Sequence, residues 1–259
     1  MKITVLTICY NSGKYIEKAI KSVLNQNYDN IEHIIIDGGS DDDTINIIQK
    51  YPHLKWISEK DKGQCDAMNK AFDKASGDII VYLNADDYFE ENIFGSVINA
   101  FQRSDTQMVV GNLYIKKGVK ITLVKPNIEF SKIIFPQKYS FPYNPVSYFY
   151  KREVQHAIGI FPLCENYAMD YWFLLRAFDK FRAVKMEIYF GTFFLNESSK
   201  TVLNSNNDTR RLASEYMKSK SFISRILFYI NNLQIDIVYS ILNMTWLKRP
   251  FKYLLFTVK

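Results

Sequence analysis

The first third of the chain alternates short apolar runs with helix-like segments, and this alternation constrains the fold more than any other feature. Four runs are predicted to be buried strands: 3–9, 31–36, 54–58 and 79–83. The segments between them are predicted to be helices: 15–24, 41–51 and 64–75. The acids that open 41–51 are expected in its first turn, where the helix dipole favours them. Such alternation predicts an α/β fold, with a mostly parallel sheet and helices on both faces.

Polar residues follow three of the predicted strands, at 7–11, 37–40 and 84–87. In open α/β sheets, ligands bind beyond the carboxyl ends of the strands. We therefore expect these three segments to meet at one binding site. Further along, 107–150 is strand-rich and irregular, 169–178 is predicted to be a helix, and 183–195 another strand.

The tail, from about residue 206, differs in character. Apolar residues recur at helical spacing from Ile223 to Leu242, and Trp246 and the basic pair at 248–249 follow them. Polar residues interrupt this stripe, whereas a membrane-spanning helix needs about 20 mostly apolar residues. The pattern predicts an amphipathic helix, and two placements stay open. It lies on a membrane surface, or it packs back on the rest of the chain.

The composition is that of a globular protein with one large domain and an appendage. Of 259 residues, 47% are hydrophobic and 23% charged. The net charge of +6 is diffuse and is not clustered in the strand-end loops, so we expect no nucleic-acid partner. The scattered cysteines Cys9, Cys65 and Cys164 are typical of reduced intracellular thiols. Met1 opens directly into a strand-like run without a leader, which predicts a cytoplasmic protein.

Asp86 and Asp87 stand at the end of the fourth apolar run. Adjacent carboxylates are costly to place together unless a cation compensates them. Mg²⁺ and Mn²⁺ are the natural candidates because these ions prefer carboxylate and phosphate oxygens. A diphosphate bound to such an ion is a better leaving group. Taken alone, however, the pair is more typical of a turn that caps the next helix.

Four runs occur in order along the chain: TVLTICYNSGKYIEKAIKSVLNQ, IEHIIIDGGSDDDT, EKDKGQCDAMNKAFDKASGDIIVYLNADD and AMDYWFLLRAF. Together they closely resemble the family 2 inverting glycosyltransferases of the GT-A fold, above all bacterial members that build capsules, O-antigens and exopolysaccharides. The resemblance covers about residues 1–195. It implies a Rossmann-like catalytic domain at 1–205, with a nucleotide-binding half at about 1–105 and an acceptor half at about 106–205. A helical extension at 206–259 would follow.

The resemblance also implies roles for particular residues. Those facing the nucleotide-sugar would be Thr7, Tyr10, Asn11, Asp37, Gly39, Asp66, Asn69 and Asp86. Asp87, with Asp86, would hold Mg²⁺ or Mn²⁺, and Asp87 would be the main ligand. Asp170 would be the general base that takes a proton from an acceptor hydroxyl. Glu165 as the base and Asp170 as a helix N-cap remain alternatives, as does Asp37 as a residue that shapes its turn.

Three positions depart from the family pattern. Gly38 stands where many relatives carry a second acid, and Asn84 where an acid often opens the metal motif. Segment 141–145 lacks a histidine that many similar bacterial enzymes have, which leaves one metal ligand unassigned. The Gln-x-x-Arg-Trp signature of processive synthases is also absent, so single addition is expected.

We therefore expect an inverting, metal-dependent glycosyltransferase that acts in cell-surface polysaccharide biosynthesis. Its donor would be a nucleotide-sugar, a UDP-sugar first, and its acceptor a glycan or lipid-linked glycan. Transfer to polyprenyl phosphate and an inactive nucleotide-binding module are the alternatives. For the C-terminal helix, contact with the cytoplasmic face of the plasma membrane and packing on the catalytic domain both stay open.

Overall fold

The computed structural model describes residues 1–103, 105–134, 141–163, 168–196 and 205–220. The chain forms two compact units, Met1–Thr209 and Arg210–Lys259, each held together by contacts between its own residues. Helix α8 (Ser205–Lys218) spans the boundary between them. The predicted amphipathic stripe from Ile223 onward lies outside the described residues.

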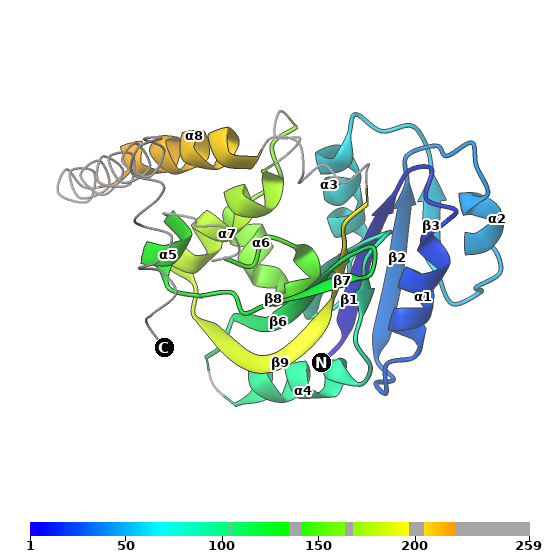
Figure 1. Cartoon of the computed structure of the whole chain (residues 1–259), viewed down its shortest axis with the longest axis horizontal. Coiled ribbons are helices and arrows are strands. Elements are labelled where there is room, and N and C mark those ends of the chain that lie inside the picture. The colour runs from blue at the N-terminus through cyan, green and yellow to red at the C-terminus, as the bar shows by residue number, and fades with distance from the viewer. Residues whose placement is uncertain (104, 135–140, 164–167, 197–204, 221–259) are drawn as a thin grey trace, which may run out of the picture. The chain divides into compact units, whose positions relative to one another are not determined.

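The first unit begins with the predicted alternation of strands and helices (Figure 1). In chain order the elements are β1 (Ile3–Cys9), α1 (Ile16–Leu24), β2 (Ile31–Asp37), α2 (Thr44–Ile48), β3 (Lys55–Ser58), α3 (Gln64–Lys74) and β4 (Ile79–Asn84). The four strands are parallel and lie in the order β3-β2-β1-β4. The first half therefore has the Rossmann-like arrangement expected from its sequence.

Helix α2 is shorter than predicted, and its acids lie elsewhere. It covers Thr44–Ile48 rather than 41–51, and its first turn contains no acid. The Asp42 carboxylate instead accepts hydrogen bonds from the backbone N–H groups of Gly13 and Thr44, each at 2.9 Å. These bonds hold the approach to α2 in a loop that joins the end of β1, because a short Asp side chain readily satisfies nearby backbone donors.

The second half completes a nine-stranded sheet in the order β3-β2-β1-β4-β8-β6-β9-β5, with β7 paired to β6. Its elements are β5 (Tyr88–Phe89), α4 (Ile93–Gln102), β6 (Met108–Lys117), β7 (Lys120–Val124), α5 (Phe130–Ile134), β8 (Tyr148–Lys151), α6 (Arg152–Ile158), α7 (Met169–Lys180) and β9 (Ala183–Phe194). Strands β5, β7 and β8 add antiparallel pairs to the parallel strands of the sheet. β6 and β9 run parallel, and the carboxyl ends of β1, β4, β6 and β9 meet at one edge.

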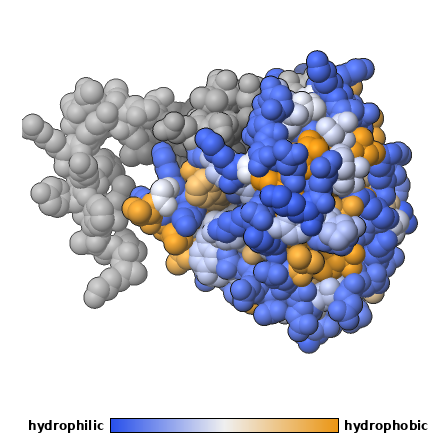
Figure 2. All heavy atoms as spheres, turned by 90° about the vertical axis from the view of Figure 1, so that its right-hand side faces the viewer, coloured by the Kyte–Doolittle hydropathy of each residue, from blue (hydrophilic) through white to orange (hydrophobic). Residues whose placement is uncertain are grey.

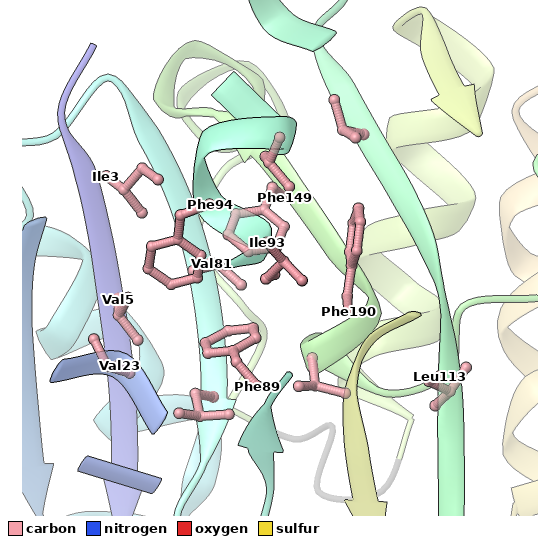
Figure 3. Packing of buried hydrophobic residues seen from close by; sticks show 14 of the residues in the cluster. Ile3, Val5, Val23, Val81, Phe89, Ile93, Phe94, Leu113, Phe149 and Phe190 are labelled. Atoms are coloured by element: carbon pink, nitrogen blue, oxygen red, sulfur yellow. The ribbon is translucent and has the colours of Figure 1, made fainter. Parts of the chain in front are cut away.

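The main core packs one face of this sheet against α1 and α4 (Figure 3). Side chains alternate along β4, so Val81 joins this cluster, whereas Tyr82 points to the opposite face. There the Tyr82 hydroxyl donates to the Met68 carbonyl of α3 at 3.0 Å, and its ring meets that of Phe161 edge-on. Helices therefore cover both faces of the sheet, as the sequence predicts.

The face on which α2 lies is largely hydrophilic and carries only small apolar patches (Figure 2). Among the described residues, no helix is both long and apolar enough to cross a bilayer.

Candidate active site

A pocket of about 380 Å³ opens at the edge where the carboxyl ends of the strands meet. Its wall comes from segments far apart in the sequence. They include the loop after β1 (Tyr10, Asn11, Ser12), the segment after β3 (Asp61, Gly63, Gln64), the loop after β4 (Asn84, Ala85, Asp86), the segment before β8 (Tyr143, Asn144, Pro145), the start of α7 (Met169, Asp170) and the end of β9 (Phe193, Asn196). Two of the three strand ends expected at the site, 7–11 and 84–87, thus contribute side chains to its wall.

The wall of the pocket is acidic. It carries the carboxylates of Asp61, Asp86 and Asp170, and none of the described residues that line it is a lysine, arginine or histidine. Like charges at close range repel strongly where water is partly excluded. The charges of this wall therefore favour cations over anions.

Asp87 is buried behind the wall, with its carboxylate held by three N–H donors. The side-chain amides of Asn84 and Asn144 donate to Oδ2 at 2.9 and 2.8 Å, and the Phe194 backbone donates to Oδ1 at 2.9 Å. Only 1% of Asp87 is exposed. The residue thus joins the ends of β4 and β9, which gives it a structural function that its sequence position does not reveal.

Asp86 is the member of the pair that lines the pocket. Its Oδ2 accepts a hydrogen bond from the Asn196 side chain at 3.0 Å. Burial raises the pKa of Asp86, and burial together with the charge of Asp86 raises the pKa of Asp87. The sequence favours Asp87 as the main metal ligand, whereas the geometry gives Asp86 the direct access.

Asp170 lies in the first turn of α7 and lines the same pocket. The residue that caps this helix is Ala168, so Asp170 is not the N-cap. Burial raises the pKa of Asp170 to about 6, and a hydrogen bond opposes that shift. The Tyr148 hydroxyl donates this bond to Oδ1 at 2.8 Å. The competing base, Glu165, lies outside the described residues.

Tyr10 and Asn11 also line the pocket, as expected for donor-binding residues. Tyr10 is 62% exposed. Asn11 has a left-handed backbone, with φ of 48°, a conformation that asparagine tolerates better than most residues. Its backbone N–H donates to the Ser40 hydroxyl at 2.8 Å, and its Oδ1 accepts from the Asp41 N–H at 3.0 Å. These bonds tie the loop after β1 to the loop after β2.

Asp37 and Gly39 shape the loop after β2. Asp37 is fully buried and accepts bonds from the Gly39 and Ser40 N–H groups at 3.0 and 2.9 Å and from the Ser58 hydroxyl at 2.7 Å. Burial acts to raise the pKa of Asp37, but these donors outweigh it and lower the pKa. Gly39 adopts φ of +82°, which glycine allows without strain. Asp37 thus shapes its turn, the alternative left open by the sequence.

Three residues that were expected to bind the nucleotide-sugar donor instead contact other residues of the protein. Thr7 is buried, and its hydroxyl bonds the His33 Nε2 at 2.9 Å. Asp66 accepts from the Lys62 N–H at 3.0 Å and pairs with Lys70. The Asn69 amide exchanges two bonds of 2.8 Å with the backbone of Phe161 and holds the loop after α6. None of the three lines the pocket described here.

Asn196 and Asp61 are polar wall residues that were not among the sequence candidates. Asn196 contacts Asp86 from a position 110 residues away. Asp61 follows β3, and a Cβ on Gly38 would meet its Oδ2 at 2.7 Å. An acidic side chain therefore lies beside Gly38, close to the position where many relatives carry their second acid. The sequence signal for Asp61 was its position shortly after a predicted strand.

Comparison with known proteins places the greater part of the chain in one family. Residues 4–164 match the family model described as glycosyl transferase family 2. The chain is 33% identical over 138 residues to an uncharacterized glycosyltransferase of Nostoc sp., an alignment that covers 51% of this chain and 43% of that protein. It is 33% identical over 123 residues to the UDP-Glc:alpha-D-GlcNAc-diphosphoundecaprenol beta-1,3-glucosyltransferase WfaP of Escherichia coli, covering 46% and 49% of the two chains. The matched region thus spans less than half of each of these relatives.

Among solved structures, the fold is similar to that of S. aureus TarS 1–349 in complex with UDP-GlcNAc, with a TM-score of 0.69. The superposition covers 86% of this chain and 68% of that one at 20% identity. At this level of identity the likeness shows a shared fold.

Proposed function

The chain belongs to glycosyl transferase family 2, and from this membership we propose that it transfers a sugar from a nucleotide-sugar donor to a glycan or lipid-linked acceptor. Its fold is the GT-A fold expected from the sequence. The observation that carries the proposal is the acidic pocket, where Asp86 and Asp170 face one cavity from β4 and α7. A UDP-sugar is the first candidate donor, because TarS has been solved with UDP-GlcNAc. The reaction would invert the anomeric carbon by direct displacement.

The pair Asp86–Asp87 fits a divalent cation such as Mg²⁺ or Mn²⁺. Asp86 offers a carboxylate at the pocket wall. Burial raises the pKa of both residues, and a cation beside them would favour their charged forms. The described residues contain no cluster of three or more metal-ligating side chains, so donor phosphate oxygens would complete the coordination. When bound, the cation would neutralise charge that develops on the leaving diphosphate. We propose that Asp86 reaches the cation and that Asp87 holds the loop that positions it.

Asp170 is proposed as the general base. A base works best when its pKa lies near the operating pH, and burial brings the pKa of Asp170 to about 6. The Tyr148 hydroxyl fixes one carboxylate oxygen, which leaves the other available to an acceptor hydroxyl. Transfer to polyprenyl phosphate stays an alternative, because a phosphate acceptor needs no base. A role in cell-surface polysaccharide synthesis is supported by the name of the E. coli relative, whose substrate is a lipid-linked sugar.

A thermal-shift experiment tests the donor proposal directly. UDP with Mn²⁺ is expected to raise the melting temperature by roughly 5–10 °C at about 100 times its dissociation constant. UDP without metal is expected to give a smaller shift, because the pocket wall is acidic. GDP, dTDP and CMP serve as matched nucleotides, and a larger shift with one of them would reassign the donor. No shift with any nucleotide, with or without Mn²⁺, would contradict nucleotide-sugar binding.

Replacing Tyr148 with phenylalanine tests the proposed base through its pH dependence. The hydroxyl that donates to Asp170 lowers the pKa of that carboxyl, so its removal is expected to raise this pKa. The rising limb of kcat/KM against pH should then move up by about one to two pH units, since a hydrogen bond to a charged group contributes about 1.5–3 kcal/mol.

Tyr171→Phe is the matched control, because this neighbouring tyrosine is buried and its hydroxyl bonds no described group. Its pH profile should match that of the wild type. An unshifted limb in Tyr148→Phe would show that the Tyr148 hydroxyl does not tune the titrating group.

A further inference from the structure

The hairpin formed by β6 and β7 exposes apolar side chains at the surface. Val119, at its turn, is fully exposed, and Ile121 and Leu123 are 58% and 62% exposed. Gly118 and Val119 form the two-residue turn, and Gly118 has the positive φ of +57° that such turns favour. Because side chains alternate along a strand, Ile121 and Leu123 share one face, while Val124 enters the core.

The cross-strand neighbours of these residues extend the same face. Lys116 lies opposite Ile121, and Tyr114 lies opposite Leu123. The Tyr114 ring stacks on that of Tyr189 from β9, with the ring centroids 4.3 Å apart and an interplanar angle of 12°. The hairpin thus presents aliphatic and aromatic side chains together, and Ile121 and Leu123 stay exposed beside the other residues that the structure describes.

Lysines surround this apolar face. Lys116, Lys117, Lys120 and Lys125 all lie within the segment 112–126, which contains no aspartate or glutamate. Among the described residues, Glu187 is the one carboxylate that forms an ion pair with these lysines, at 3.5 Å from Lys125. Tyrosine rings and lysines around exposed aliphatic groups match the chemistry of an anionic bilayer surface.

The turn of the hairpin lies close to the mouth of the pocket. Lys116 pairs with Phe194 at the end of β9, and the Leu195 N–H donates to the Lys116 carbonyl at 2.8 Å. The neighbouring residues Phe193 and Asn196 line the pocket. A surface that binds the hairpin would therefore also lie close to the pocket.

We propose that the β6–β7 hairpin docks on an anionic lipid bilayer and brings the mouth of the pocket to the membrane surface. Val119, Ile121 and Leu123 enter the interface, and the lysines contact phosphate headgroups. A second copy of the chain fits less well, because pairing two such edges would bring lysines of like charge together. The docking goes beyond the proposed reaction. Its test needs no sugar donor, so its failure would leave that reaction standing.

Vesicle flotation of the full chain tests the electrostatic part. The protein is expected to float with phosphatidylcholine vesicles that contain phosphatidylglycerol and to remain behind with phosphatidylcholine alone. Lys117→Gln combined with Lys120→Gln should weaken binding by about 5-fold per lysine at low ionic strength. The matched control replaces two exposed lysines elsewhere, Lys50→Gln with Lys74→Gln, and should bind like the wild type.

The apolar part is tested by Val119→Ser combined with Ile121→Ser and Leu123→Ser. This variant should lose the binding that persists in high salt, whereas Leu24→Ser, at a side chain 52% exposed on α1, should not. Circular dichroism confirms that each variant is folded, and Val119→Ser alone serves if the triple variant is not. Wild-type affinity in the hairpin variants, or no vesicle binding by the wild type, would overturn the proposal. Dimerisation that the triple variant abolishes, without vesicle binding, would assign the face to a second copy instead.

Discussion

Asp170→Asn is expected to lower kcat for sugar transfer by about 10²–10⁴-fold, the usual contribution of a general base. An amide cannot take the proton of the acceptor hydroxyl, yet it has almost the same shape as the carboxylate. The Tyr148 hydroxyl can still donate to the oxygen at position 170, so the wall of the pocket should keep its geometry. Donor binding, measured by thermal shift, should therefore be unchanged while transfer is lost.

The pH dependence of kcat/KM provides a second test with Asp170→Asn. A base must be ionised to accept a proton, and the pKa of Asp170 is about 6. Wild-type kcat/KM should therefore rise with pH through about 6 and level off above it, and the residual activity of Asp170→Asn should lack this limb. Full activity in the variant would refute the assignment of Asp170 and favour a phosphate acceptor, which needs no base.

Stability provides the control for folding. A carboxyl whose pKa is raised on folding contributes its full stability below its ordinary value near 3.8 and loses that contribution as the pH rises through about 6. Asparagine does not ionise, so Asp170→Asn should be no less stable than the wild type at pH 8. A melting temperature well below that of the wild type would mean that lost activity reflects lost structure.

The sequence was sufficient to predict the parallel half of the sheet. Strands β1, β2 and β4 are mostly buried on both faces, and this produces the continuous apolar runs that mark them. The apolar pattern of the second half is weaker, because β9 is partly exposed along its length. Its pairing with β6 also contains register shifts. The acids before α2 were placed wrongly, since the bond of Asp42 to Gly13 depends on a contact between two loops.

Residues of the site could be predicted where they follow a strand or open a helix. Tyr10, Asn11, Asp86 and Asp170 all reach the pocket wall for that reason. Asn69, by contrast, lies on α3, and helical spacing does not show which loop its amide will bond.

Asn196 illustrates a further limit. Its contact with Asp86 exists because β5 pairs with β9, Tyr88 opposite Thr192, across a long sequence separation. No local pattern encodes such a pairing.

Asp86→Asn and Asp87→Asn are expected to fail in different ways. Asp86 lines the pocket and makes one side-chain bond, from Asn196, which an asparagine oxygen can still accept. Its replacement should therefore preserve the fold, abolish the extra thermal shift that Mn²⁺ gives with UDP, and lower transfer by about 10²-fold or more. Loss of one charged ligand removes several kcal/mol of stabilisation from the developing charge on the leaving diphosphate.

Asp87→Asn should instead destabilise the protein, by about 1–3 kcal/mol. The wild-type carboxylate accepts three N–H donors, and an amide turns its own N–H group toward at least one of them. Asn144 cannot turn its oxygen toward residue 87 in response, because that oxygen already accepts the Val146 N–H at 2.9 Å. Melting temperature and Mn²⁺-dependent UDP binding, measured on both variants, separate the two roles. Normal binding in Asp86→Asn, beside lost binding in a stably folded Asp87→Asn, would return the metal to Asp87 and contradict the order of access that the pocket gives.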